Sequence, residues 1–453
     1  MKILINLNKN FIDSINSSVI KLLIKQLSFF LLFIGLTITQ ANAQENSLGK
    51  CWNKQVKETV NNYLNIYFDE NLNQLEHNFK PWAQTNYLIK GKAWINYDNF
   101  IKEDKLPFNG KDYFSKTVFN KSELLLINYG EDSLSKITKE AFLEQTFKNS
   151  RYSPINIINY FFYNKIKISS KSNKEFDIYE SKINNTIVSL YISKKDNLLI
   201  KVNLLDNDDL YGDVLTSFNY SKFSKLNNLY FPRKISIEKI NRKLKDSIDI
   251  SNALLTKKIP EILTKPSDYT FVKEVPSKPE ISFKKYNESI YFIELKHTDD
   301  RVMVVEFENF VLVAEAPINS ENGELIISEI KKNIKNKPIK YFVFGHHHPH
   351  YLGGIRAFIH EGANIISLDM NKDYINYIAN AKHSIKPDNL EKEYKKVQFK
   401  DLKDSLLIED NKTKLQIFFI GEKSQHTNDY LIYFFPNEKI LFEDDLLQYN
   451  GHK

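Results

Sequence analysis

The sequence predicts two domains, an α+β domain built on an antiparallel β meander with helices, followed by a layered α/β domain. Three observations support this fold class. The chain has 453 residues, more than one domain usually holds. Apolar and polar residues alternate through residues 165–255, as in half-buried antiparallel strands. Beyond residue 285, short apolar runs alternate with helical patterns, which indicates helices layered on a sheet.

Composition and charge limit the class of protein. Hydrophobic residues make up 42% of the chain and charged residues 26%, which is enough apolar material for a folded core. The net charge is +7, of which residues 1–43 hold +3 (four Lys and one Asp), so the rest carries +4. This mild charge, without a clustered basic face, does not indicate a nucleic-acid partner. The single cysteine, Cys51, excludes an intrachain disulfide and a zinc site of several thiolates.

The first 43 residues predict a secretory signal peptide. Residues 27–39 form an uncharged apolar run after Lys21 and Lys25, and Ala41 and Ala43 are the small residues that a signal peptidase requires. This run is shorter than the ~20 apolar residues that span a bilayer. We therefore expect cleavage after Ala43, export to the periplasm or the medium, and a mature protein without a membrane span.

The first domain is expected over residues 44–255. Apolar residues spaced by three or four predict an amphipathic helix within 50–80 and another over 136–149. We find no catalytic constellation in this domain, so its expected roles are packing and the binding of a ligand. Two hairpins are predicted, one from strands Thr186–Ser193 and Leu198–Leu204 and one from strands Val214–Phe223 and Tyr230–Ile240.

A linker is predicted over residues 256–284, because four of the thirteen prolines fall between Pro260 and Pro279. Proline fixes φ and lacks an N–H, so it interrupts both helix and sheet. The second domain is then expected over 285–453. Its predicted strands are Ser289–Glu294, Val302–Glu306, Phe310–Ala314, Ile339–Phe344, Asn364–Ser367, Leu415–Ile420, Tyr430–Phe435 and Lys439–Phe442, and its predicted helices are Glu324–Ile334, Ile355–Glu361 and Asn371–Ala381.

Histidines gather directly after the predicted strand Ile339–Phe344, where four of the ten lie within residues 346–350. Side chains alternate along an extended segment, so His346 and His348 project to one side and His347 to the other. Two imidazoles on one side can hold a single borderline-soft cation. The preceding strand supplies rigidity, and the following Gly353-Gly354 permits a tight entry into a helix. The pattern favours a metal site over an exposed polar loop.

Residues 346–354, His-His-His-Pro-His-Tyr-Leu-Gly-Gly, resemble the His-x-His-x-Asp-His-x-Gly-Gly signature of the metallo-β-lactamase superfamily. Three further segments are similar to the family in order. Phe310–Pro317 resembles a strand that ends in an acidic residue, Ser424–Asp429 resembles a His-Thr turn, and Leu441–Leu446 resembles Phe-x-Gly-Asp. The likeness extends over about 285–450. It implies a four-layer αββα sandwich that binds one or two metals, usually zinc.

The resemblance also implies metal ligands. His346, His348 and His426 would form a three-imidazole zinc site that keeps a position for water, and Asp445 would bridge or bind that water. His350 stands where the family has a metal-binding Asp, and Tyr351 where it has a third His. We therefore expect one zinc site and a second site that is weak or absent. The family normally continues to a terminal metal-binding His, so the sandwich is expected to be incomplete at its C-terminal end.

Further roles follow from the same resemblance. Asp445 and His350 are the predicted catalytic residues, Asp445 by orienting or deprotonating water and His350 as a proton shuttle or a ligand of the second site. His347, Glu315 and Tyr351 are expected to contact the ligands rather than to bind the metal themselves.

Four other residues carry less specific expectations. Asp444 replaces a Gly of the family, which leaves three readings open: a solvated side chain, a strained turn or an alternative ligand. No motif surrounds His297, His360 and His383, so these side chains are expected on the surface.

Two functions of different classes follow as hypotheses. The first is an exported zinc-dependent hydrolase, in which metal-activated water attacks an ester, thioester, lactone or similar small-molecule substrate. The second is a catalytically inactive binding protein of the cell envelope that keeps the sandwich and binds a ligand in its first domain. A carrier of zinc or copper is a third possibility. The sequence indicates no oligomeric state.

Overall fold

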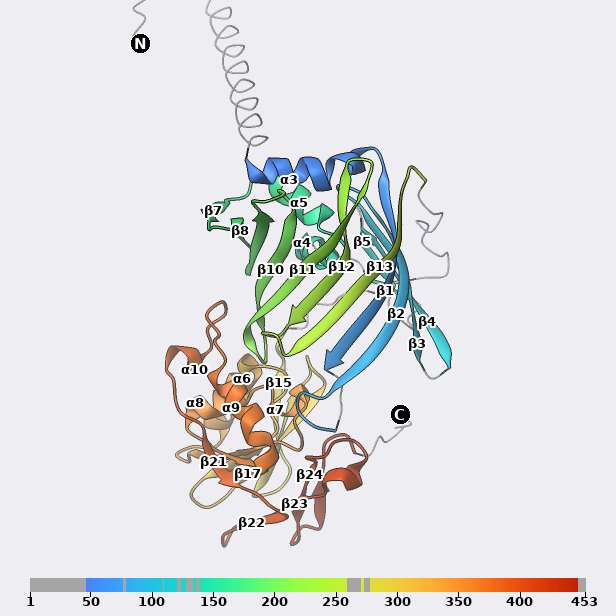
Figure 1. Ribbon diagram of the computed structural model, residues 1–453. Helices are drawn as coiled ribbons and strands as arrows, with labels where there is room; N and C mark the ends of the chain where they lie inside the picture. The colour runs from blue at the N-terminus through green and yellow to red at the C-terminus, as the bar shows by residue number, and fades with distance from the viewer. Residues whose placement is uncertain are drawn as a thin grey trace, which may run out of the picture.

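The computed structural model describes residues 46–75, 79–108, 110–119, 124–127, 133–135, 139–258, 270–272 and 278–446. They form an N-terminal domain around one long curved sheet and a C-terminal domain of two smaller sheets with helices (Figure 1). The predicted signal peptide lies outside the described residues. Within the described part of the chain, no helix is both long enough and apolar enough to cross a membrane.

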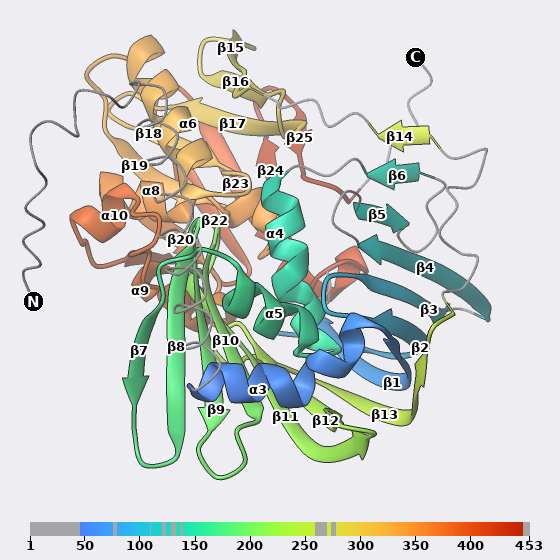
Figure 2. The ribbon, with the colours of Figure 1, turned by 90° about the horizontal axis from the view of Figure 1, so that it is seen from above.

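The N-terminal domain is one antiparallel sheet of twelve strands, in the order β5-β4-β3-β2-β1-β13-β12-β11-β10-β9-β8-β7. Strands of a wide sheet twist relative to one another, and this sheet curls into an open trough (Figures 1 and 2). We call it the trough below. Its strands are β1 Tyr63–Leu75, β2 Gln84–Ile95, β3 Phe100–Phe108, β4 Lys111–Phe119, β5 Leu124–Ile127, β7 Ser169–Ser172, β8 Phe176–Ile183, β9 Thr186–Ser193, β10 Leu199–Asp208, β11 Gly212–Leu226, β12 Leu229–Lys239 and β13 Leu244–Thr256.

Three helices, α3 (Ser47–Gln55), α4 (Lys139–Lys148) and α5 (Ile155–Tyr163), lie on the concave side of the trough (Figure 2). The side chain of Asn46 caps α3 by accepting the N–H of Gly49 at 2.8 Å. Helix α5 buries Ile155, Ile158 and other apolar side chains in the same core as the strands. The trough is therefore filled by its own helices near one end.

The predicted hairpins and the helix over 136–149 are confirmed by β9–β10, β11–β12 and α4. The predicted helix within 50–80 is correct only at its start, because α3 ends at Gln55 and β1 begins at Tyr63. From Tyr63 the chain is rich in β-branched and aromatic residues, which favour a pleated surface. Leu64, Ile66 and Phe68 are buried at alternate positions, which is the period of a strand.

The predicted linker, 256–284, contains a short strand. β14 (Thr270–Val272) pairs in parallel with β6 (Ser133–Ser135) of the first domain. Pro260, Pro266 and Pro276 lie outside the described residues. The connection between the domains is thus tied back to the N-terminal domain at one point.

The C-terminal domain has a seven-stranded sheet in the order β15-β16-β17-β18-β19-β20-β21 and a four-stranded sheet in the order β22-β23-β24-β25. Strands β18 to β21 run parallel and are joined through helices. The strands are β15 Ile281–Lys285, β16 Ile290–Leu295, β17 Asp300–Glu306, β18 Val311–Ala314, β19 Ile339–Val343, β20 Asn364–Ser367, β21 Gln398–Asp401, β22 Ser405–Glu409, β23 Lys414–Phe419, β24 Leu431–Phe435 and β25 Ile440–Phe442. The helices are α6 Ser320–Asn333, α7 Pro349–Leu352, α8 Ile355–Glu361, α9 Lys372–Asn380 and α10 Asn389–Lys392.

Two hydrophobic clusters define the layers of this domain. One packs α6, α8 and α9 on a face of the larger sheet, and the other fills the space between the two sheets. Strand β18 contributes to both, because Val313 belongs to the first cluster and Leu312 and Ala314 to the second. The described residues thus form three layers, α, β and β, of the predicted αββα sandwich. The smaller sheet leaves Leu407 and Leu441 exposed.

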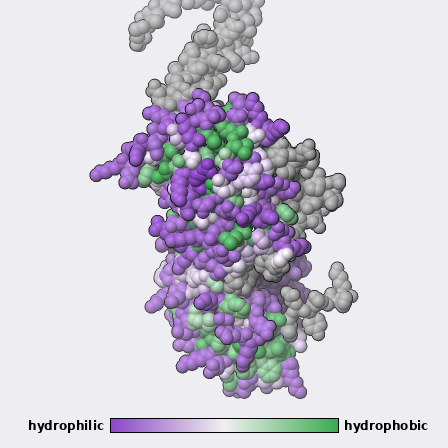
Figure 3. Space-filling view, turned by 45° about the vertical axis from the view of Figure 1, so that its right-hand side comes forward, coloured by the Kyte–Doolittle hydropathy of each residue, from purple (hydrophilic) through white to green (hydrophobic). Residues whose placement is uncertain are grey.

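The two domains meet where turns of the trough reach the C-terminal domain. The carboxylate of Asp213 accepts the N–H groups of Ser384 at 2.9 Å and Ile385 at 3.0 Å. The hydroxyl groups of Tyr211 and Tyr374 are 2.9 Å apart in a buried contact. On the face seen in Figure 3 the surface is mostly hydrophilic, and hydrophobic side chains gather toward the two ends of the molecule.

Candidate metal centre

The histidine segment, which we call the metal loop (residues 344–354), leaves the end of β19 and stays inside the protein. His346, His347 and His348 are all buried. The loop is bound to the segment after β18 by backbone hydrogen bonds, including Ala316 N–H to Tyr351 O and Gly354 N–H to Ala316 O, both 2.8 Å. A Cβ on Gly353 would lie 2.4 Å from the backbone of Ile318, so this close packing requires glycine. The Gly-Gly pair, predicted to permit a tight entry into a helix, thus also allows a close approach of two backbones.

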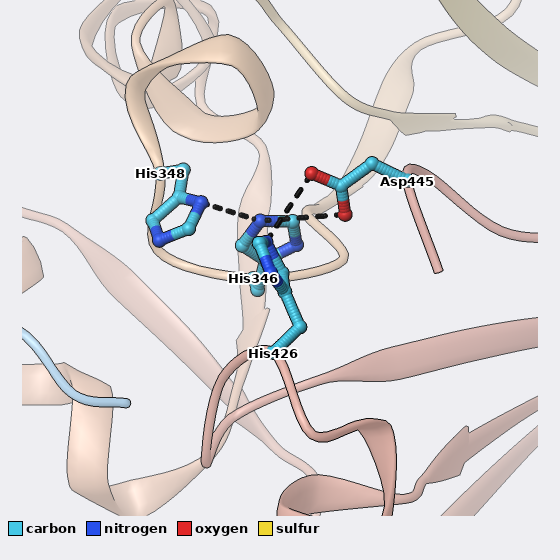
Figure 4. A group of neighbouring side chains, drawn as sticks. All are labelled: His346, His348, His426 and Asp445. Atoms are coloured by element: carbon cyan, nitrogen blue, oxygen red, sulfur yellow. Dashed lines mark hydrogen bonds and ion pairs between the residues drawn. The ribbon is translucent and has the colours of Figure 1, made fainter. Parts of the chain in front are cut away.

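His346, His348, His426 and Asp445 come together although they lie on three separate loops. One ligand atom from each of the four residues lies within 4.8 Å of all the others. Nε2 of His346 is 2.8 Å from Nδ1 of His348, and Nε2 of His426 is 3.2 Å from Oδ2 of Asp445. The three rings and the carboxylate are turned toward one another (Figure 4).

The donor set fits a zinc ion. Three imidazole nitrogens are a zinc ligand set whose fourth tetrahedral position takes either a water or the carboxylate oxygen of Asp445, and bonds of ~2.0–2.2 Å separate neighbouring ligand atoms by about 3.4 Å. The closest ligand atoms, Nε2 of His346 and Nδ1 of His348, are 2.8 Å apart, and all four ligand atoms lie within 4.8 Å of one another, a range that includes that value. The group therefore has both the chemistry and the spacing for one ion.

Turns on either side of the smaller sheet hold His426 and Asp445 in place. Ser424 Oγ accepts the N–H groups of His426 and Thr427, both at 3.1 Å. The hydroxyl of Tyr430 accepts the N–H of Asp445 at 3.0 Å. The side chains of His426 and Asp445 are 31% and 35% exposed, whereas that of His346 is fully buried. Solvent thus reaches the group from the side of His426 and Asp445.

His346 is neutral at physiological pH. Burial lowers the pKa of its imidazole to about 4, although the nearby carboxylates of Asp445 and Asp429 act in the opposite direction. Its ring lies nearly parallel to that of Tyr430, with centroids 4.9 Å apart. A neutral ring offers a lone pair to a cation without first losing a proton.

Two carboxylates contact the Nδ1 atoms of two histidines of the metal loop. Asp444 Oδ2 is 3.1 Å from His346 Nδ1, and Asp429 Oδ1 is 2.9 Å from His347 Nδ1. Asn371 donates to the other oxygen of Asp429 at 2.8 Å. Burial opposes ionisation of Asp429, but the hydrogen bonds from His347 and Asn371 outweigh it and lower its pKa. Of the three readings left open for Asp444, the solvated side chain is wrong, because the side chain of Asp444 is fully buried; it lies against His346, a supporting contact that none of the three described.

Glu315 supports the metal loop through hydrogen bonds of its side chain. Its carboxylate accepts the N–H of Gly345 at 3.1 Å and the hydroxyl of Tyr433 at 2.9 Å. Its backbone has φ +78, a left-handed conformation that is strained for a residue with a side chain. Burial, together with the neighbouring Asp444, raises the pKa of Glu315 well above its ordinary value. The structure thus places Glu315 against the loop and not among the candidate ligands, as the resemblance implies.

The structure does not bring His350 to the group. Its side chain is 50% exposed, and its Nδ1 lies 3.1 Å from Oδ1 of Asp300. The residue belongs to α7, whose first turn directs it away from the buried His348, so its expected roles as ligand and proton shuttle have no support in this geometry. Tyr351 does lie beside His346, with ring centroids 4.3 Å apart. Burial and the carboxylates of Asp444 and Asp445 raise the pKa of Tyr351, which makes its hydroxyl a poor ligand.

Several residues of the centre were not predicted from the sequence. Asp429 lies inside the matched second motif, where its position three residues after His426 was a usable signal. Asn371, Tyr430 and Tyr433 have no motif around them, and their roles follow only from packing. The expectation that His383 lies on the surface is wrong, because its side chain is buried between the domains.

No protein-family model matches this chain, and no curated protein sequence matches it. Among solved structures, a metallo-beta-lactamase from Pontibacter korlensis is similar at 17% identity and a TM-score of 0.28, over 36% of this chain and 71% of that one. The DIM-1 metallo-beta-lactamase is similar at 17% identity and a TM-score of 0.28, over 36% of this chain and 69% of the other. A flavoprotein from Thermotoga maritima matches at 15% identity and a TM-score of 0.28, over 37% of this chain and 42% of its own length.

Proposed function

We propose that this protein is an exported, zinc-dependent hydrolase of the metallo-β-lactamase superfamily. Its substrate is a small molecule with an ester, thioester, lactone or related bond. The proposal joins three features of the chain: a leader with the pattern of a secretory signal, four ordered motifs similar to that superfamily, and a cluster of ligand atoms at the place that those motifs predict.

The meeting of three imidazoles and a carboxylate is the observation that carries the proposal. His346 and His348 come from the loop after β19, His426 from the loop before β24, and Asp445 from the segment after β25. Side chains this far apart in the sequence converge by chance only rarely, and buried histidines without a partner cation are costly. Asp444 adds a hydrogen bond to His346 of the kind that orients metal-binding histidines in other proteins.

The zinc ion and the side chains around it would have separate roles in the reaction. A zinc ion in this group would lower the pKa of water toward ~7 and polarise a carbonyl oxygen. Asp445 would orient an entering water and accept its proton, because its carboxylate lies at the exposed side of the group. The buried rings of His346 and His348 would keep the ion fixed. His350 has no part in this proposal.

Metal content, measured by elemental analysis of the mature protein, tests the first step. We expect about one zinc per chain, retained through gel filtration. His346→Ala should abolish that binding, since it removes the central imidazole of the group. His360→Ala is the matched control, because His360 is a partly exposed residue of α8 whose ring pairs with Glu393, away from the candidate ligands. His350→Ala should also retain the ion.

Hydrolysis of a generic aryl ester and a thioester by the zinc-loaded protein tests the second step. Turnover that disappears in His346→Ala and persists in His360→Ala supports the hydrolase. A well-folded protein that binds no divalent metal would contradict the proposal at its first step. Full zinc loading without turnover of any ester or thioester would contradict the second step alone.

One observation favours the alternative, a binding protein of the cell envelope. The N-terminal domain has a cavity of about 970 Å³ around α5, lined by aromatic and apolar side chains that include Trp52, Phe119 and Tyr160. A cavity of this size accommodates a drug-sized or lipid-like molecule. Extraction of the purified protein with organic solvent, followed by mass spectrometry, would identify a retained ligand if this is the main role.

A further inference from the structure

A cleft of about 610 Å³ lies between the two domains beside the candidate metal centre. We call it the interdomain cleft. Its C-terminal wall includes His348 of the metal loop and Tyr374 of α9, and its N-terminal wall includes Trp82, Asp208 and Tyr211 of the trough. His348 belongs to both the cleft wall and the candidate metal group, so a molecule in this cleft would lie beside one of the four candidate ligands.

The wall formed by the trough is held in place by aromatic contacts across the interface. The ring of Trp82 stacks on Tyr211 with centroids 5.2 Å apart and meets the edge of Tyr374 at 5.3 Å. Tyr211 and Tyr374 are also linked through their hydroxyl groups. The cleft is therefore preformed, and both domains fix its shape.

The connection between β1 and β2 reaches both parts of the metal centre. The carbonyl of Phe79 accepts the N–H of Asn428, two residues beyond His426, at 2.6 Å. Three residues further along, Trp82 lines the interdomain cleft next to His348. One segment of the N-terminal domain thus lies along the two loops that supply all three imidazoles.

The charge in the cleft disfavours anions. Asp208 and Asp209 line it together with Lys80, and no arginine is among its described lining residues. Asp209 is paired with Lys386 at 3.6 Å, so Asp208 is the acidic group available to a ligand. Asp208 Oδ1 accepts the N–H groups of Leu210 and Tyr211. Its Oδ2 has no hydrogen bond or ion pair within the described part of the chain. The free polar groups of this wall are therefore mainly acceptors, which suit a donor or a cation and not a phosphoryl or sulfate group.

The aromatic groups add apolar surface to the cleft. Lys243 Nζ, which does not line the cleft, already lies 4.7 Å from the ring centroid of Trp82. Lys243 thus already takes a cation position over the indole, and Tyr211 stacks on the same ring, so Trp82 contributes mainly apolar surface to the cleft. The apolar Leu75 and Ile318 also line the cleft. An organic group with a hydrophobic part and a positive or neutral end fits these walls.

We propose that the interdomain cleft is the substrate-binding site, that its specificity comes from the N-terminal domain through Trp82 and Asp208, and that it takes uncharged or cationic organic substrates in preference to phosphate or sulfate esters. This inference rests on the proposed hydrolase function and narrows its substrate class.

Two esters of the same shape test the proposal with zinc-loaded protein. Choline phenylacetate and 3,3-dimethylbutyl phenylacetate differ only in a quaternary nitrogen or carbon, and phenyl phosphate represents the excluded class. We expect both carboxylic esters to be hydrolysed, the choline ester with the lower KM, and phenyl phosphate at least a hundredfold more slowly in kcat/KM. Asp208→Asn should raise the KM of the choline ester about tenfold and change that of its neutral isostere less than twofold.

The variant is chosen to preserve the fold. Asparagine keeps the Oδ1 that accepts the two backbone N–H groups, so only the charge is lost. Asp249→Asn is the matched control, because Asp249 is an exposed residue of β13 that pairs with Lys234. Trp82→Ala should raise the KM of both carboxylic esters.

The outcomes separate this inference from the proposed function. Turnover in which Asp208→Asn changes both esters equally, or in which phenyl phosphate is preferred, overturns the cleft as the specificity site. If the zinc-loaded protein hydrolyses none of the three, the hydrolase fails, and calorimetry with benzyltrimethylammonium decides about the cleft. Binding that weakens about tenfold in Asp208→Asn supports the site, and absence of binding overturns it.

Discussion

The carboxylate of Asp444 lies 3.1 Å from Nδ1 of His346, and both side chains are fully buried. An ionised Asp444 accepts the Nδ1 proton of a neutral His346 in this contact and leaves the lone pair of Nε2 directed at His348 and Asp445, whereas burial raises the pKa of Asp444 well above its ordinary value. Gly345 makes the contact possible, because a Cβ at that position would lie 1.7 Å from Asp444 Oδ2. The metal loop and the last described segment of the chain therefore pack closely against each other where Asp444 meets His346.

Removal of the Asp444 carboxylate should weaken zinc binding. We expect Asp444→Ala to raise the dissociation constant for zinc about 10- to 100-fold, the usual effect of losing a partner that orients a metal-binding histidine. Asp444→Asn should recover part of this loss, since its carbonyl oxygen still accepts from Nδ1. Competition with a chromophoric chelator measures both variants, and equal affinity in wild type and Asp444→Ala would contradict the assigned role.

A side chain at residue 345 should displace Asp444. Gly345→Ala is expected to destabilise the protein by about 1–3 kcal/mol, the range for overpacking a closely packed site. The double variant Gly345→Ala/Asp444→Gly should regain most of the free energy of unfolding but not the affinity for zinc. Urea denaturation of the single and double variants measures the coupling, and additive effects would show that the two residues do not interact.

Arg356 is a buried cation whose hydrogen bonds connect α8 with the end of α9 and with Asp388. It binds both oxygens of Asp388 and donates to the carbonyls of Ile378, Ala379 and Ala381 at the end of α9. Arg356→Met should cost about 3–5 kcal/mol because it leaves a buried carboxylate without its partner. Chemical denaturation measures this loss. Lys331→Met, which breaks the exposed pair with Glu361, should change stability by less than ~0.5 kcal/mol.

His383 should make stability depend on pH. Burial, and then the nearby Arg356, lower the pKa of His383 in the folded state. The unfolded chain, with a histidine pKa of ~6.5, takes up the proton first as the pH falls. This contribution is therefore complete above about pH 6.5 and is lost as the pH decreases toward the folded pKa. Urea midpoints between pH 5 and 7.5 should fall more steeply for wild type than for His383→Asn, and identical slopes would exclude this origin.

Local patterns were sufficient for most of the secondary structure. The alternation of β9 to β13 and the short apolar runs of β16 to β20 are visible in the sequence because each element buries one face or both. The prediction failed at β1, where apolar residues at Val60, Leu64 and Tyr67 fit a helical spacing. The pairing of β1 with β2 and β13 decides that segment, and pairing between distant residues leaves no local signal.

The candidate ligands could be predicted for a different reason. His346 and His348 are adjacent in a recognisable pattern, and His426 and Asp445 lie in segments that resemble motifs of one family. The assignment of His350 required knowledge of where α7 begins, because one turn of helix directs its side chain to Asp300 and not to the group. The wall contributed by Trp82 and Asp208 was beyond prediction, since it depends on how two domains dock.

Leu210 and Tyr211, although they belong to the trough, are part of the same hydrophobic cluster as α8 and α9. The proline-rich segment therefore separates the two domains in the sequence but does not make them energetically independent. Separating the halves at that point would expose apolar surface on both, so the intact chain should melt as one cooperative unit and neither half should be fully stable when expressed by itself.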